Sequence, residues 1–414
     1  MSASVEQQAA AIMRGAEFGD EATRRTMERE LRERLAEGRP LRVYCGYDPT
    51  AVDLHLGHTL TMRKLRTFQD FGHEVTFLIG NFTGLVGDPS DTDKTRPMLS
   101  PEQLEENSQT YVDQAFRILD RERTIVRRNA DWLGALGFGD VLRLASHFTV
   151  AQFLERDNLA RRFERHDPIH VSEFLYALMQ AYDAVAMETD VQVGGSDQLF
   201  NLMAGRVLQR EYGQQPQIAI TLPLLNGTDG NLKMSKSLGN HIGIDEPPND
   251  LFGKVMSIPD SSLRSYFTLL TDLSDVEIEA LLAGAPMEAK KRLAFEITTG
   301  LHDPAAAEAA RDYFESTFQR RQTPDAMPEY ALSADGDGGP SGRLDRVLVD
   351  AQLAKSGAEV RRLVEQGAVR VNGEPVDAFD RAVHPGDELR VGRRRFLRLV
   401  ANPAAMREPG ASDA

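Results

Sequence analysis

Cysteine is almost absent from the 414-residue chain, in which Cys45 is the only one. A disulfide within the chain is therefore excluded, as is a zinc site built from cysteines, and we interpret Cys45 as a buried thiol in a strand. No stretch of about 18 apolar residues occurs, which excludes a membrane-spanning helix. No repeat of fixed period is apparent, which argues against solenoids and propellers. The first residues show neither a secretory nor an Arg-rich transit pattern, so we expect a cytoplasmic protein.

Positive charge is also in short supply. The chain carries 48 Lys and Arg against 63 Asp and Glu, a net charge of −15, which argues against a nonspecific nucleic-acid coat. The exception is the stretch 343–399, where twelve Lys and Arg stand against nine Asp and Glu. A mildly basic tail on an acidic body indicates an appended module with a polyanionic partner.

Strand-like segments alternate with helical patterns over residues 35–240. The segments that favour strands are 41–46, 75–79, 124–128, 190–193 and 217–222. A strand–helix–strand unit with short connections implies parallel strands and a right-handed crossover. We therefore predict an α/β fold, with a doubly wound parallel-sheet (Rossmann-like) domain over 1–245 that contains a helical insertion at about 125–185.

The rest of the chain divides by composition. Residues 246–325 carry helical patterns without a convincing strand, so a helical domain is expected there. Residues 326–342 are predicted to be a linker because Gly, Pro and small polar residues crowd this stretch. Over 343–414 we expect a small α/β domain, helical over 343–366 and with short strands near 369–373 and 389–391.

Two histidines stand where the first predicted strand gives way to a helix. Asp48-Pro49-Thr50 follows the strand, and His55-Leu56-Gly57-His58 opens the helix. This point of a doubly wound sheet is the mouth where ligands bind, and a helix N-terminus attracts phosphate. Gly57 carries no Cβ, so a flat ring can approach the backbone there. An isolated His-x-x-His more often caps a helix, but this position favours a ligand site.

A short basic loop follows the last predicted strand of the sheet. Its sequence is Lys233-Met234-Ser235-Lys236-Ser237. Two ammonium groups on such a loop suit a polyphosphate. Taken alone, two nearby lysines usually indicate a solvated basic loop, and a short basic loop is weak evidence for a ligand site.

One face of a predicted helix offers three polar groups. Tyr176, Gln180 and Asp183 are spaced four and three residues apart, so they share that face. Apolar residues surround them, and a buried carboxylate is costly without a partner. A ligand hydroxyl would supply that partner.

The two loop motifs together give the chain a resemblance to the class I aminoacyl-tRNA synthetases, which carry a His-x-Gly-His signature and a Lys-Met-Ser-Lys-Ser signature at opposite ends of one α/β domain. Within that class the chain is similar to the bacterial-type tyrosyl-tRNA synthetases. The segments that carry this likeness are 44–50, 87–90, 176–183 and 194–198.

The resemblance implies a role for each matching residue. Tyrosine would be bound by Tyr44, Asp88, Tyr176, Gln180, Asp183 and Gln198, with Tyr44 and Asp183 on its hydroxyl. The ATP phosphates would be contacted by Thr50, His55, His58, Lys233, Lys236 and either Lys94 or Arg96. The remaining ATP-binding positions would be Asp48, Gly57, Gly195 and Asp197.

The tail resembles the RNA-binding domain first seen in a ribosomal small-subunit protein. Ser356 is expected to cap its second helix, with Glu359 completing a capping box. The residues expected to meet RNA phosphates are Arg343, Arg346, Arg361 and Arg362.

The implied reaction is activation of L-tyrosine by ATP to tyrosyl-adenylate and pyrophosphate, followed by transfer to the terminal ribose of tRNA(Tyr). Magnesium would accompany the polyphosphate, no zinc or other protein-bound metal is expected, and the family is homodimeric. A tryptophan-specific synthetase and a catalytically silent RNA-binding relative are the alternatives. A nicotinamide dehydrogenase is discarded, since no Gly-x-Gly-x-x-Gly follows the first strand.

Overall fold

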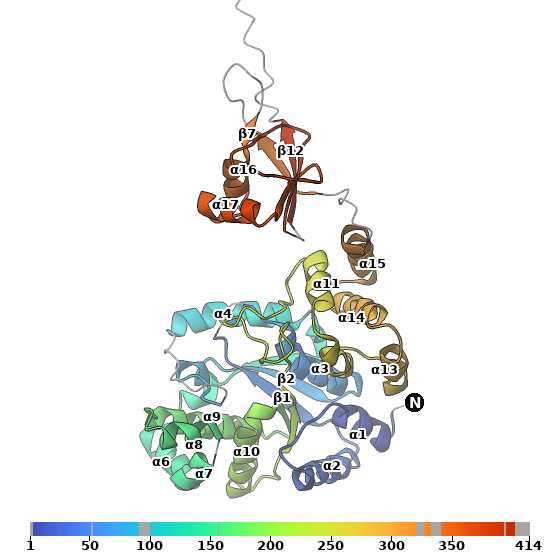
Figure 1. Cartoon of the computed structure of the whole chain (residues 1–414). Helices are drawn as coiled ribbons and strands as arrows, with labels where there is room; N and C mark the ends of the chain where they lie inside the picture. Colours follow the sequence, from blue (N-terminus) through green and yellow to red (C-terminus); the bar gives the residue numbers. More distant parts are fainter. Residues whose placement is uncertain are drawn as a thin grey trace, which may run out of the picture. The chain divides into compact units, whose positions relative to one another are not determined.

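The computed structural model describes residues 3–50, 53–90, 100–155, 157–319, 327–332, 341–392 and 395–401. The chain divides into two compact units, Met1–Phe314 and Glu315–Ala414, and each is described by itself. Figure 1 shows the sheet of the first unit with helices on both of its faces. None of the described helices is long and apolar enough to cross a membrane.

A five-stranded sheet forms the centre of the first unit. Its strands are β1 (Arg42–Tyr47), β2 (Glu74–Ile79), β3 (Thr124–Arg128), β4 (Val191–Gly195) and β5 (Ile218–Leu222). They lie in the order β3-β2-β1-β4-β5, and every neighbouring pair is parallel. The predicted doubly wound sheet is therefore confirmed. The chain changes direction across the sheet between β1 and β4, and ligands bind at this point of such sheets.

Helices cover the sheet and extend it. The N-terminal and crossover helices are α1 (Val5–Met13), α2 (Glu21–Leu35), α3 (Leu56–Asp70), α4 (Pro101–Ala115) and α10 (Leu199–Glu211). Between β3 and β4 lie α5 (Ala130–Leu133), α6 (Phe138–Ser146), α7 (Val150–Leu154), α8 (Asp157–Glu164) and α9 (Val171–Ala186). After β5 come α11 (Pro248–Met256), α12 (Leu263–Leu270), α13 (Asp275–Leu282), α14 (Pro286–Leu301) and α15 (Pro304–Phe314).

One hydrophobic core joins the sheet to the helices that follow it. Val43 of β1, Phe252 of α11 and Leu293 of α14 belong to the same buried cluster. Burial of this kind on both faces explains why β4 and β5 read as nearly continuous apolar runs, whereas the edge strand β3 is only partly buried. The boundary at residue 245 between a catalytic and a helical domain stays a prediction.

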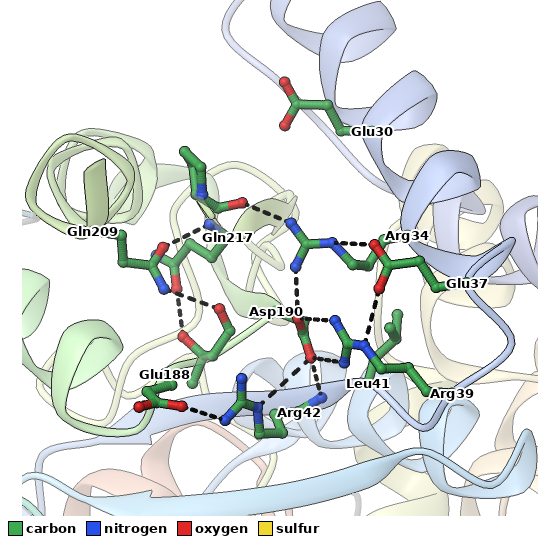
Figure 2. A network of polar contacts seen from close by, with 12 residues as sticks. Glu30, Arg34, Glu37, Arg39, Leu41, Arg42, Glu188, Asp190, Gln209 and Gln217 are labelled. Atoms are coloured by element: carbon green, nitrogen blue, oxygen red, sulfur yellow. Dashed lines mark hydrogen bonds and ion pairs between the residues drawn. The ribbon is translucent and has the colours of Figure 1, made fainter. Parts of the chain in front are cut away.

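A buried ion-pair network closes the end of the sheet opposite the carboxyl ends of its strands (Figure 2). Asp190, which directly precedes β4, accepts hydrogen bonds from Arg34 of α2 (2.6 Å) and from two nitrogens of Arg39 (both 2.7 Å). It also accepts from the backbone N–H of Arg42 (2.8 Å). The network therefore ties the N-terminal helices to the first residues of β1 and β4.

The second unit is a small α/β fold. Its elements are β6 (Glu329–Leu332), β7 (Gly342–Arg343), α16 (Leu344–Asp350), α17 (Gly357–Glu365), β8 (Val369–Val371), β9 (Glu374–Pro375), β10 (Ala382–Val383), β11 (Glu388–Val391) and β12 (Arg395–Ala401). One sheet has the order β6-β12-β11-β8-β9, and β10 pairs with β7.

The tail differs from the sequence prediction in its helices and in its strands, since β7, β10 and β12 were not predicted. The helical stretch 343–366 is two helices, because the chain turns between α16 and α17 and Ser356 starts a new helix. Within the predicted linker, Glu329–Leu332 forms β6, which pairs in parallel with β12. A four-residue strand beside a Gly-rich run leaves too little periodicity to be recognised in a sequence.

Candidate functional site

A cavity of about 750 Å³ opens at the carboxyl ends of β1 and β4. Of the sequence-predicted site residues, it is lined by Tyr44, Asp48, Thr50, His55, Gly57, His58, Asp88, Tyr176, Gln180, Asp183, Gly195, Asp197, Gln198, Lys233 and Lys236. The structure thus brings together every predicted catalytic, tyrosine-binding and ATP-binding residue that it describes. Lys94 and Arg96 lie outside the described residues.

The two histidines cap the helix that starts at the cavity. His55 is the N-cap of α3, where its Nδ1 accepts from the Gly57 N–H, and His58 Nδ1 accepts from the His55 N–H (both 3.2 Å). A Cβ on Gly57 would lie 2.9 Å from the His55 ring, so the bare backbone is needed. Burial, with the nearby His58 and lysines, lowers the pKa of His55 to about 2. Neutral His55 then carries its proton on Nε2 and acts as a hydrogen-bond donor there.

Both lysines of the basic loop are paired with carboxylates. Lys233 Nζ lies 3.2 Å from Asp197 Oδ2, and Lys236 Nζ lies 2.8 Å from Asp53 Oδ2. These ammonium groups are partly exposed, so their pairing is weak enough to be exchanged for a more highly charged ligand. We call this part of the cavity, with His55 and His58, the phosphate end.

Tyr44 and Asp183 are buried together and form what we call the floor of the cavity. Asp183 accepts from Trp132 Nε1 (2.7 Å) and from Asn129 Nδ2 (3.3 Å). Burial raises the pKa of Asp183 to about 8, although these two donors oppose the shift. Tyr44 Oη is buried without a hydrogen-bond partner among the described residues. The floor therefore fits a ligand that brings a hydroxyl group.

A second set of polar groups, which we call the middle of the cavity, is joined to the floor by hydrogen bonds. Tyr176 Oη donates to Asp48 Oδ2 (2.9 Å), and Thr83 Oγ1 donates to Asp48 Oδ1 (2.7 Å). Asn129 Nδ2 donates to Thr83 (3.0 Å) and so links Asp48 to the floor. The expected place of Asp48 near the adenosine stays a prediction.

Asp88 is held by its neighbours in this middle region. Gln198 Nε2 donates to Asp88 Oδ2 (2.5 Å), and the Ser90 N–H donates to Asp88 Oδ1 (2.9 Å). Gln180 Oε1 is buried and finds no hydrogen-bond partner within the described part of the chain. The carboxylates of Asp48 and Asp88 and the amide oxygen of Gln180 thus line the same cavity. Their negative charge and acceptor oxygens suit a small cationic group of a ligand.

Sequence reasoning missed several contributors. They are Asp53, Thr83, Asn129, Trp132 and Asn201. A positional signal was available for Asn129 and Trp132, because they follow β3 directly and the carboxyl ends of parallel strands meet at one edge. Asp53, Thr83 and Asn201 join the site through pairing that only the folded chain shows.

The four predicted RNA-binding arginines lie exposed on the second unit. Arg361 stacks over the Phe379 ring, 4.3 Å from its centroid, and Arg343 forms two hydrogen bonds with Asp345. Ser356 caps α17 as predicted. The expected capping box is wrong: Glu359 accepts from the N–H of Lys355 rather than from Ser356.

Comparison with known proteins settles the family. Residues 36–319 match the family model described as tRNA synthetases class I (W and Y), and residues 342–389 match the S4 domain. The tyrosine–tRNA ligase of Geobacter sulfurreducens is 47% identical over 409 residues, which cover 96% of this chain and 99% of that protein. The chain belongs to the tyrosine–tRNA ligases.

Other members of the family agree. The tyrosine–tRNA ligase of Thermotoga maritima is 47% identical over 380 residues, covering 90% of this chain and 93% of that protein. A C-terminally truncated mitochondrial tyrosyl-tRNA synthetase from Aspergillus nidulans matches in structure with a TM-score of 0.62 and 25% identity, covering 76% of this chain and 94% of that chain. The resemblance inferred from the sequence is thereby confirmed, and with it the class I fold and the S4-type tail.

Proposed function

We propose that the chain activates L-tyrosine with ATP to give tyrosyl-adenylate and pyrophosphate, and then transfers tyrosine to the 3′-terminal ribose of tRNA(Tyr). The observation that carries this proposal is one cavity with three chemically distinct parts. Its floor suits a hydroxyl, its middle suits an ammonium and its phosphate end suits a polyphosphate. Tyrosine and ATP together present those groups in that order.

The floor and the middle would hold tyrosine. The phenol would lie against Tyr44 and Asp183, whose polar atoms are buried side by side. The α-ammonium would be bound by Asp88, Tyr176 and Gln180, with Gln198 lining the same space. These contacts would leave the tyrosine carboxylate directed toward the phosphate end.

The phosphate end would hold ATP and stabilise the reaction. The tyrosine carboxylate attacks the α-phosphorus in line, a new carboxyl–phosphate bond forms, and the bond to pyrophosphate breaks. No protein nucleophile is needed, so the chain contributes position and charge. Hydrogen bonds would come from His55, His58 and Thr50 and positive charge from Lys233 and Lys236, with Arg96 or Lys94 added by resemblance.

The adenosine would lie near Asp48, Gly195 and Asp197, with Gly57 opening space at the start of α3. A Cβ on Gly195 would sit 2.4 Å from Asp197 Oδ1, so a side chain there would displace that carboxylate. The absence of a Cβ at Gly195 thus preserves the orientation of Asp197. Asp197 in turn lies against Lys233 of the phosphate end.

Magnesium would enter with the ATP phosphates. Among the described residues, no group of three or more His, Cys, Asp or Glu side chains is arranged to hold a metal ion. We therefore assign no residue to magnesium and none to zinc.

The second unit would bind tRNA(Tyr). The exposed arginines Arg343, Arg346, Arg361 and Arg362 are suited to phosphate contacts, which position an RNA without reading its bases.

We further propose that the chain works as a cytoplasmic homodimer. Large apolar side chains are exposed on the neighbouring helices α6 to α9: Phe138, Leu142, Val150, Phe163 and Val171. Exposure of this kind is typical of an interaction surface. Phe163→Glu is expected to shift the molar mass measured by light scattering from dimer to monomer, whereas a wild-type chain that is already monomeric would contradict the proposal.

Amino-acid-dependent ATP–pyrophosphate exchange tests the central proposal. Exchange is expected with tyrosine and to be far weaker with phenylalanine or tryptophan, followed by charging of tRNA(Tyr). Faster exchange with tryptophan than with tyrosine would instead indicate a tryptophan-specific synthetase, the other specificity in this family. No exchange from folded protein would favour the silent RNA-binding relative.

A further inference from the structure

Residues 87–90, which carry Asp88, are held from two sides. On the cavity side, Gln198 bonds to Asp88, and Asn201 Nδ2 donates to Ser90 Oγ (3.3 Å). On the other side, Asn158 Nδ2 of α8 donates to the backbone carbonyl of Pro89 (2.5 Å). Asn158 is buried and does not line the cavity. Its contact therefore acts on the backbone next to Asp88 and touches no ligand.

The helix that carries Asn158 is locked to α9. Arg162 of α8 is 1% exposed, and its two terminal nitrogens donate to the two carboxylate oxygens of Glu173 (2.5 and 3.0 Å). Glu173 lies in the first turn of α9 and also accepts from the His170 N–H (2.9 Å). A bidentate buried pair of this kind fixes both distance and direction between two helices.

Apolar packing strengthens the same connection. Leu159 of α8 is fully buried in one cluster with Ala177 and Leu178 of α9. Asn158, Leu159 and Arg162, at relative positions 0, 1 and 4, form the buried side of α8, whereas Phe163 at the edge of that side and Glu164 on the opposite side are exposed. The inner face of α8 thus contacts α9 and residues 87–90 at once. We call Asn158, Leu159 and Arg162 the α8 bracket.

We propose that the α8 bracket positions the ammonium site for tyrosine, with Asn158 as its positioning residue. Asp88 lies on residues 87–90, whereas Tyr176 and Gln180 lie on α9. The bracket joins these two segments and so sets the spacing of groups that must contact the same ammonium. This inference rests on the proposed function, which assigns those three residues to the ammonium.

A kinetic split tests the proposal in the full-length protein. Asn158→Ala is expected to raise the KM for tyrosine about three- to tenfold, the range that follows from one lost hydrogen bond. The KM for ATP and the exchange rate at saturating tyrosine should stay at wild-type values, because the contacts of α8 shown above lie at residues 87–90 and α9, on the tyrosine side of the cavity. Glu164→Gln, on the exposed face of the same helix, is the matched control and should change none of them.

Asn158→Leu provides a second variant if the alanine protein folds poorly. Leucine fills a similar volume but offers no donor to the Pro89 carbonyl, so the same rise in KM for tyrosine is expected. An unchanged KM for tyrosine in both variants would overturn the proposal. An equal rise in the KM values for tyrosine and ATP would overturn it too, since it would indicate general loosening.

Two tyrosine analogues give a readout that a merely structural role would not produce. Tyramine keeps the phenol and the ammonium, whereas 3-(4-hydroxyphenyl)propionate keeps the phenol and lacks the ammonium. Both compounds are used as competitive inhibitors of exchange. The inhibition constant of tyramine should be three- to tenfold higher for Asn158→Ala than for wild type, and that of the propionate should not change. Equal weakening of both compounds would contradict the α8 bracket.

Asp88→Asn separates this inference from the proposed function beneath it. If Asp88→Asn leaves tyramine inhibition unchanged, the ammonium site itself is wrong. If Asp88→Asn raises the inhibition constant of tyramine but neither Asn158 variant does, the ammonium site is supported and only the positioning role of the α8 bracket is refuted.

Discussion

We propose that single side chains at the floor of the cavity decide which amino acid fits. Phenylalanine differs from tyrosine by one hydroxyl, and in this slot it would leave Asp183 and Tyr44 buried without a ligand partner. Loss of a partner for a buried polar group costs more than loss of a methylene contact. Trp132 and Asn129 hold Asp183 in place, so the carboxyl cannot turn away to find water.

Asp183→Asn should therefore reduce kcat/KM for tyrosine strongly. At a pH above about 8, where Asp183 is ionised, an amide accepts a weaker hydrogen bond than the carboxylate, and the lost charged bond corresponds to roughly 10- to 100-fold. The ratio of kcat/KM for tyrosine over phenylalanine, measured by pyrophosphate exchange, should fall with it. A wild-type ratio in Asp183→Asn would show that Asp183 does not face the phenol.

Tyr44→Phe separates binding from stability at the same floor. The phenol of Tyr44 has no hydrogen-bond partner among the described residues, so its removal should leave Tm unchanged or slightly higher. Tyrosine affinity should nevertheless fall about two- to tenfold, the range for a neutral hydrogen bond. Thermal unfolding together with equilibrium dialysis of tyrosine measures both. A lower Tm with unchanged affinity would give Tyr44 a structural role only.

Lysines at the phosphate end should act on the rate rather than on tyrosine binding. Lys233→Ala or Lys236→Ala is expected to slow adenylate formation by ~10²-fold or more, because each removes a charge that we propose acts on the leaving pyrophosphate. Tyrosine affinity should change little. Stopped-flow rates with separately measured affinities check this, and Lys254→Ala, whose ammonium pairs with Glu246, is the control. Weaker tyrosine binding with normal chemistry would contradict it.

Site residues could be predicted from the sequence where a short motif contains several polar side chains that act together. His55, His58, Lys233 and Lys236 line one cavity because their segments follow β1 and β5 of a parallel sheet. Asp53 escaped notice because its partner Lys236 lies 183 positions away. Pairing at that separation leaves no local pattern.

At the scale of elements, the Asp190 network joins α2, β1 and β4 (Figure 2). Burial alone would raise the pKa of Asp190, but hydrogen bonds from Arg39, the Arg42 backbone and Arg34 outweigh it and hold the pKa below its usual value. A carboxyl whose folded pKa is depressed contributes stability above its unfolded pKa of about 3.9 and loses it as pH falls through the folded pKa.

Asp190→Asn should accordingly lower the free energy of unfolding at pH 7 by about 3–5 kcal/mol, because Arg34 stays buried without its carboxylate. The difference from wild type should shrink as pH falls below the unfolded pKa of about 3.9 and toward the lower folded pKa of Asp190, because the unfolded wild-type chain takes up the proton first. Urea unfolding across pH 3–7 measures it. Asp70→Asn, which breaks only the exposed Arg66–Asp70 pair, should cost about 0–1 kcal/mol. If the difference in free energy of unfolding were the same at every pH, Asp190 would not contribute to the loss of stability in acid.

Element prediction succeeded for long, periodic segments and failed for short ones. The sheet strands of the first unit stand within one or two residues of their predicted positions, because buried parallel strands have strong apolar runs. In the tail, β6 and β12 were not recognised. Their pairing brings together segments more than 60 residues apart, and β6 spans only four residues.

At the scale of the whole molecule, the two compact units differ in charge and in expected task. The tail is best removed as a unit, because a cut at residue 343 would leave β6 without β12 and expose Leu332, which is 2% exposed in the intact chain. Deletion of residues 320–414 keeps the region that matches the synthetase family model.

The chain lacking 320–414 should exchange pyrophosphate with tyrosine within about twofold of wild type, since the whole cavity lies in the first unit. Charging of tRNA(Tyr) should fall by ~10²-fold or more, because the proposed phosphate contacts of the tail would be lost. Four arginine contacts also predict that the slope of log binding constant against log salt is shallower by roughly three to four in the deleted protein. Filter binding at several salt concentrations measures that slope, and full-rate charging by the folded, deleted protein would refute the tail's role in tRNA binding.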